Sequence, residues 1–205
     1  MKKAILYFVM MWAVAVSYGQ NDSSKSAWIF EMSEGFSKAM GYPSISLFDD
    51  ATESYNSMLS NIFIGRGKAQ NSEYYGLSYS HMLGNTIQPY RERYSLSSVM
   101  LSAREVVPVG DRFGLWAGLN VGVGLMTNSY VVEEKTIDVD RFLAVYSLNA
   151  GISYDITERT YIGMDVSVFG APLYKHDYEV PVGTTKNYQN NISGFQLKLN
   201  IGVRL

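Results

Sequence analysis

The chain has 205 residues, no cysteine and a formal net charge of −2 at pH 7. The lack of cysteine excludes a disulfide framework, a thiolate metal site and a lipid-modified N-terminal cysteine. The weakly acidic balance provides no basic footprint for nucleic acid, so nucleic-acid binding is set aside as a function class.

The N-terminal segment has the parts of a secretory signal peptide. Two lysines are followed by an uninterrupted apolar run over 4–16, and Ser17 and Gly19 supply the small residues of a cleavage site. The alternative is a transmembrane anchor, but a spanning helix needs about 20 apolar residues and this run is shorter. We therefore predict a signal peptide over 1–19 and one mature domain over 20–205.

The first half of the predicted domain contains four segments with the apolar–polar alternation of β-strands. In chain order these segments are 28–38, 59–68, 73–83 and 93–107. In the fourth segment the alternation changes phase at Ser97 and Ser98, which predicts a β-bulge. Glu34 breaks the pattern of the first segment because it shares the apolar face of Phe30 and Met32. Either a bulge or a different strand boundary would explain its position.

The second half shows the same alternation more clearly, in segments 113–125, 142–155, 161–168 and 195–205. One face of the last segment is entirely apolar: Phe195, Leu197, Leu199, Ile201, Val203 and Leu205. Most of the segments reach the roughly 9 to 11 residues of a tilted membrane strand, whereas ordinary strands average about five or six. Glycines on the polar face of 113–125 predict a narrow, packed lumen.

The connections between these segments alternate strictly between long and short. The long ones are 39–58, 84–92, 128–140 and 172–192, and the short ones are 69–72, 108–111 and 156–158. Bacterial barrels have short periplasmic turns and longer extracellular loops. We therefore predict an all-β fold: an eight-stranded, antiparallel, up-and-down transmembrane β-barrel with both ends in the periplasm.

The alternative architecture is a soluble lipocalin-like barrel, whose apolar face would point inward around a ligand. Alternation alone fits both architectures. Strand length, small residues on the polar face, and tyrosine and tryptophan near the strand ends favour lipid outside the barrel.

Three segments resemble a known family. The hairpin 94–125, the strand and turn 148–157, and the closing segment 201–205 are similar to the outer-membrane β-barrel family widespread in Bacteroidota. This resemblance implies a small eight-stranded barrel in the outer membrane, mostly without a defined activity. The last strand also resembles the C-terminal signal read by the barrel-insertion machinery, although Leu205 stands where many such proteins have phenylalanine.

His81 is the one histidine on a predicted strand, and it lies on the lipid-facing side with Tyr79 and Leu83. A lipid-modifying enzyme would need a serine and an acid beside it. No His-x-Ser arrangement follows His81, and the strand pattern assigns no acid partner. We therefore predict no catalytic residue.

Metal binding is considered for two loop segments. His176 and Asp177 lie in the last long loop without further ligands at suitable spacing. Asp49, Asp50 and Glu53 cluster in the first long loop but lack an EF-hand spacing. We therefore predict neither a metal site nor a cofactor.

Five charged residues fall on the predicted lumen face: Glu31, Arg104, Asp165, Lys198 and Arg204. Asp165 and Lys198 are expected at the same height on neighbouring strands, with Glu31 flanking Lys198 from the other side. Because the lumen of an eight-stranded barrel is filled by side chains, these charges should pair. Their network would be a structural plug or, alternatively, a gate for small solutes or ions.

The sequence thus favours a non-enzymatic integral outer-membrane protein with an envelope-structural or surface-interaction role through its loops. The alternatives are a narrow channel for small solutes or ions, a lipid-modifying enzyme and a soluble ligand-binding barrel. Outer-membrane lipids, lipopolysaccharide and the insertion machinery are the partners that this reading implies.

Overall fold

The computed structural model describes residues 26–40, 54–68, 73–85, 93–132, 135–172, 176–179, 185–188 and 191–205. The strands are β1(Ser26–Met40), β2(Ser54–Lys68), β3(Glu73–Asn85), β4(Arg93–Val109), β5(Phe113–Val132), β6(Lys135–Asp155), β7(Thr160–Pro172), β8(His176–Glu179), β9(Thr185–Tyr188) and β10(Asn191–Arg204). Within the described ranges, no helix is long and apolar enough to cross a membrane. The predicted signal peptide lies outside these ranges and stays a prediction.

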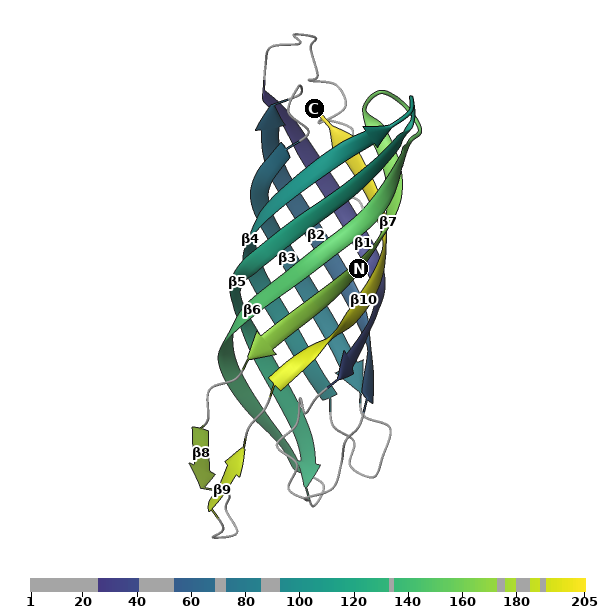
Figure 1. Cartoon of the computed structure of the whole chain (residues 1–205). Coiled ribbons are helices and arrows are strands. Elements are labelled where there is room, and N and C mark those ends of the chain that lie inside the picture. Colours follow the sequence, from purple (N-terminus) through teal and green to yellow (C-terminus); the bar gives the residue numbers. More distant parts are fainter. Residues whose placement is uncertain are drawn as a thin grey trace.

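Eight strands close into an antiparallel barrel in the order β1-β10-β7-β6-β5-β4-β3-β2. The barrel is closed by the pairing of β1 with β10, which runs from Ile29 opposite Arg204 to Met40 opposite Ser193. Figure 1 shows the strands strongly tilted, with β8 and β9 as a separate small hairpin beyond the end of β7. The predicted eight-stranded antiparallel barrel is therefore confirmed.

The two ends of the barrel differ, and we name them by their connections. The short-turn end carries the turns between β4 and β5 and between β6 and β7, together with the C-terminus at the top of Figure 1. Gly110 in the β4–β5 turn has a φ of 72°, a left-handed conformation that favours glycine. The long-loop end, at the bottom of Figure 1, carries β8 and β9.

The strands extend further toward the long-loop end than the alternation predicted. The predicted loop 128–140 is mostly a hairpin, because β5 and β6 stay paired until Val132 opposite Lys135. The predicted loop 172–192 contains β8 and β9. Polar residues such as Asp138 and Asp140 replace the apolar face in this extension, so the periodicity gave no signal there.

The bulge predicted at Ser97 and Ser98 is wrong. The strand β4 pairs with β3 and β5 in continuous register through both serines. The apparent change of phase arises because Leu96 and Met100 point into the lumen, where they are buried. β1 also has continuous register at Glu34, so that residue does face outward with no bulge to explain it.

The two faces of the wall have opposite character. The outer face exposes large apolar side chains on every barrel strand, for example Leu101, Leu148 and Leu199. The inner face is buried, and glycines make room for large rings. At Gly202, a Cβ would lie only 2.2 Å from the Tyr161 ring. The lumen is therefore packed by side chains and is not an open pore.

Candidate functional site

The lumen is the candidate site, and the first of its ion pairs joins β1 and β4. Arg104 Nη1 and Nη2 donate to the two carboxylate oxygens of Glu31, at 2.7 and 2.8 Å. The Tyr161 hydroxyl on β7 donates to Glu31 Oε2 at 2.6 Å. The Glu31 side chain is 1% exposed. Such a bidentate ion pair holds both side chains in one geometry and offsets the free-energy cost of burying the Glu31 carboxylate.

Aromatic rings hold the Arg104 guanidinium in place. Its central carbon lies 4.0 Å from the centroid of the Trp116 ring and 4.6 Å from that of Phe63. A desolvated cation against two ring faces gains electrostatic stabilisation from the π systems. The guanidinium therefore has both charge and ring partners and little freedom to move aside.

A second ion pair joins β7 and β10. Lys198 Nζ lies 2.9 Å from Asp165 Oδ1, and the two residues are directly opposite in the strand register. Asn200 donates to the other Asp165 oxygen at 2.9 Å. Lys198 also donates to Asn149 Oδ1 on β6 at 3.3 Å. Amide side chains on β10 itself and on β6 thus complete the contacts of this pair.

Arg204 forms a third pair at the short-turn end. Its Nη1 donates to Asp155 Oδ1 at 2.8 Å, and its guanidinium lies 4.8 Å from the centroid of the Tyr161 ring. These side chains are 23% and 30% exposed, so this pair is partly solvated where the other two are buried.

The structure distributes the five predicted lumen charges over three separate pairs. Glu31 pairs with Arg104 across the lumen instead of flanking Lys198, because the register places Gly35 opposite Lys198. Whether these residues act as a plug or a gate stays a prediction. Sequence reasoning did not single out four partners: Asp155, Asn149, Asn200 and Tyr161. All four share the lumen face by alternation, but alternation does not say which side chains meet across a lumen.

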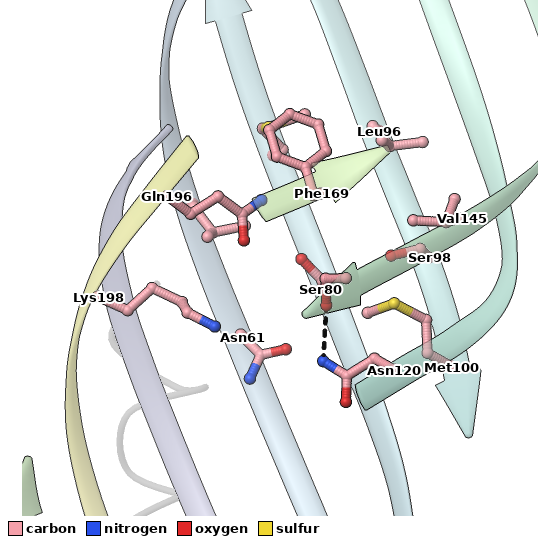
Figure 2. Close-up of a pocket in the computed structure, with 13 residues that line it drawn as sticks. Asn61, Ser80, Leu96, Ser98, Met100, Asn120, Val145, Phe169, Gln196 and Lys198 are labelled. Atoms are coloured by element: carbon pink, nitrogen blue, oxygen red, sulfur yellow. Dashed lines mark hydrogen bonds between the residues drawn. The ribbon is translucent and has the colours of Figure 1, made fainter. Parts of the chain in front are cut away.

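A small cavity lies beside the second ion pair. Its volume is about 20 Å³, and its lining includes Asn61, Ser80, Asn120, Phe169 and Lys198. Figure 2 shows Lys198 and Asn61 on one side of this space and Phe169 on another. A cavity of that size holds about one water molecule. It is too small for a solute.

Apolar side chains fill the lumen on the long-loop side of this cavity. We call this buried cluster the apolar plug: Leu59, Met82, Tyr94, Leu96, Met100, Met126, Leu143, Val145, Phe169 and Ala171. Its members come from β2 to β7, so it crosses the lumen from wall to wall. The described lumen is therefore occluded twice, by charge pairs and by the apolar plug.

The remaining candidate residue, His81, lies on the outer wall. His81 Nδ1 lies 2.9 Å from the Ser97 hydroxyl on β4, and Ser60 on β2 donates to Glu34 Oε2 at 2.9 Å. The serine beside His81 was missed because it comes from the paired strand and not from the residues that follow His81 in sequence.

The metal candidates do not gain support. Asp49, Asp50 and Glu53 lie outside the described residues. His176 and Asp177 belong to β8, where only the backbone is described. Among the described residues, no group of three or more histidine and acidic side chains is placed to hold a metal ion.

No protein-family model and no curated protein matches the chain. Among solved structures it is similar to Neisserial surface protein A, with 15% identity, a TM-score of 0.58, and coverage of 87% of this chain and 98% of that one. The attachment invasion locus protein Ail of Yersinia pestis gives 11% identity, a TM-score of 0.47 and coverage of 86% and 98%. The N-terminal β-barrel domain of Pseudomonas aeruginosa OprF gives 15% identity, a TM-score of 0.43, and coverage of 89% of this chain and 98% of that one. At these identities the likeness shows the fold alone, that of small outer-membrane β-barrels.

Proposed function

We propose that the chain is an integral outer-membrane protein with a closed lumen, which contributes to the envelope by its structure and by its surface loops and not by catalysis. The observation that carries this proposal is that the outer and inner faces of the same barrel have opposite character. The outside exposes apolar side chains on every barrel strand, while the inside is filled by ion pairs and the apolar plug.

An outward apolar face requires a lipid surround. Leu101, Leu148 and Leu199 are 71%, 60% and 66% exposed, and large apolar side chains in such numbers on every strand would be an aggregation hazard in water. A closed barrel satisfies every backbone hydrogen bond along the wall, as a bilayer demands. We assign the short-turn end to the periplasm and the long-loop end to the cell exterior, following the usual order in bacterial barrels.

The proposed partners follow from this location. Lipids and lipopolysaccharide of the outer membrane would cover the apolar wall, and the barrel-insertion machinery would read the alternating β10 strand. The signal peptide over 1–19 would supply export. The long loops would provide the recognition surface, because loops on a rigid barrel carry interaction without constraining the fold.

Localisation and closure can be tested together. Outer membranes containing the protein should yield a band that shifts in mobility between unboiled and boiled samples on an SDS gel. The same protein, reconstituted in planar bilayers, should show no stepwise current. Recovery in the periplasmic fraction without a mobility shift would instead support the soluble barrel, with its two faces reversed.

The charge network gives the sharper test of closure. Lys198→Met removes the charge beside the cavity but leaves the apolar plug in place, so we expect conductance to stay at the background of the bilayer. A clear rise in current, with the heat-modifiable band intact, would contradict a plug. It would favour the alternative function, a narrow gated path for small solutes or ions.

A further inference from the structure

Four polar side chains form a row across the outer face of β1 to β4. We call Glu34, Ser60, His81 and Ser97 the outer-wall row. The strand register places them directly opposite one another in that order. Two hydrogen bonds divide the row into the pairs Glu34–Ser60 and His81–Ser97, both at 2.9 Å.

Apolar residues flank most of the row on both sides along the strands. Toward the long-loop end, the next outward positions on β1 to β3 are Phe36, Met58 and Leu83, which are 69%, 65% and 53% exposed, whereas the one on β4 is the partly exposed Ser95. Toward the short-turn end, the next outward positions on β3 and β4 are Tyr79 and Val99, also exposed. The row is therefore set within the apolar wall and is separated from the loops. In the proposed orientation we place the row in the outer leaflet, near the start of the acyl chains, because the next outward residues beyond Phe36 and Met58 are the polar Lys38 and Asn56.

Ionisable groups at lipid-facing positions are costly, and a carboxylate there points to a functional contact. Ser60 supplies one hydrogen bond to Glu34, whereas an ionised carboxylate offers about four acceptor positions. Glu34 is exposed, and His81 and Ser97 are partly exposed. The row therefore has spare acceptors that face lipid. A phosphate would be repelled by Glu34, whereas a neutral hydrogen-bond donor would fit.

We propose that the outer-wall row binds a lipid of the outer leaflet through a hydroxyl or amide donor near the start of its acyl chain. This inference rests on the proposed outer-membrane location and orientation. Hydroxylated acyl chains have the required chemistry: an apolar tail that lies along the wall and a donor at the depth of the row. The donor would bond to the Glu34 carboxylate, on the same row as the His81–Ser97 pair.

The same residues do not form a nucleophilic triad. A serine–histidine pair needs a third group that orients the histidine. Within the described part of the chain, Glu34 is bonded to Ser60 and His81 to Ser97, with no hydrogen bond between the two pairs. Binding is therefore the chemistry that the row supports.

The experiment uses the full protein with ¹⁵N-labelled histidine in dodecylphosphocholine micelles. The two histidines give separate ring signals, and His176→Gln assigns the one from His81. The probes are methyl 3-hydroxytetradecanoate and methyl tetradecanoate, which differ by one hydroxyl. We expect the hydroxylated ester to shift the His81 signals saturably, and to do so at an about five-fold lower concentration than the plain ester.

Two variants with the same chemical change separate the site from general effects. Glu34→Gln should weaken the response to the hydroxylated ester by about five-fold, because one carboxylate acceptor is replaced by an amide donor. Glu105→Gln alters an outward carboxylate near the short-turn end of β4, outside the row, and should leave the response unchanged. The heat-modifiable band of each sample verifies that the barrel is folded.

Equal responses to the two esters, or none, would overturn the inference. So would a shift that follows protein concentration instead of the ester, since it would assign the row to contact with a second copy of the chain. These failures are distinct from failure of the proposed function, which would appear as loss of the heat-modifiable band from the outer-membrane fraction of the unaltered protein.

Discussion

Glu31 and Glu34 are three residues apart on one strand, yet they face opposite sides of the wall. The inner carboxylate, 1% exposed, accepts two hydrogen bonds from Arg104 and one from Tyr161. The outer one is exposed and accepts one from Ser60. Because side chains alternate between the two faces of a strand, one glutamate lies in the packed lumen and the other lies on the outer wall. The inner one stabilises the packing, and the outer one is placed where it can contact a ligand.

The two carboxylates differ in how strongly they depend on their present partners. A buried charge that loses its partner cannot recover the lost energy from water, whereas an outer carboxylate can take another partner. Substitutions inside should therefore cost much more stability than substitutions in the outer-wall row. Four changes test this comparison.

Arg104→Met should have the largest effect. It leaves the Glu31 carboxylate buried without its ion partner, which should lower the free energy of unfolding by about 3–5 kcal/mol. Urea titration of the protein in phosphatidylcholine vesicles measures the loss. The double variant Glu31→Gln with Arg104→Met should recover most of it. An unchanged unfolding midpoint for the single variant would show that the ion pair is unimportant.

Leu148→Arg tests the outer face. Leu148 is 60% exposed and lies midway along the outward face of β6, where an arginine should cost about 2–4 kcal/mol in a bilayer. The same titration in vesicles gives the value, with Glu158→Arg in the exposed β6–β7 turn as the control. If both variants were equally stable, lipid would not cover this face.

Gly202→Ala tests the packing beside the ion pair. The new Cβ would lie 2.2–2.4 Å from Tyr161 ring atoms, so the ring must move and its hydrogen bond to Glu31 must weaken. Overpacking of this kind should cost about 1–3 kcal/mol. Because the two residues touch, the effects of Gly202→Ala and Tyr161→Ala should not add in a double-mutant cycle. Additive effects would contradict the contact.

Glu34→Gln should have the smallest effect. The amide keeps an oxygen that accepts from Ser60, so the free energy of unfolding should fall by no more than about 1 kcal/mol. Glu31→Gln is the matched inner variant and should cost clearly more under the same urea titration. Equal losses would remove the distinction between the two faces.

Alternation predicted the barrel and its inner and outer faces well, because the period of two is local to each strand. Asp165 and Lys198 meet across neighbouring strands, at equal heights in the wall. The pairing of Glu31 with Arg104 was beyond reach, since the contact spans the lumen and depends on the shear of the closed barrel. The bulge predicted in β4 was wrong for a related reason. Leu96 and Met100 face the lumen as part of the apolar plug, whereas the prediction assumed that apolar residues face outward.

The most direct test of the two-faced wall uses the native tryptophans. Trp28 is 48% exposed on the outer face, whereas Trp116 is 5% exposed in the lumen. The variants W12F/W116F and W12F/W28F each retain one of them. In vesicles of dibrominated phosphatidylcholine, fluorescence of Trp28 should be strongly quenched and that of Trp116 should be largely preserved. Quenching of Trp116 alone, or equal quenching of both, would contradict a lipid-facing outer wall around a closed lumen.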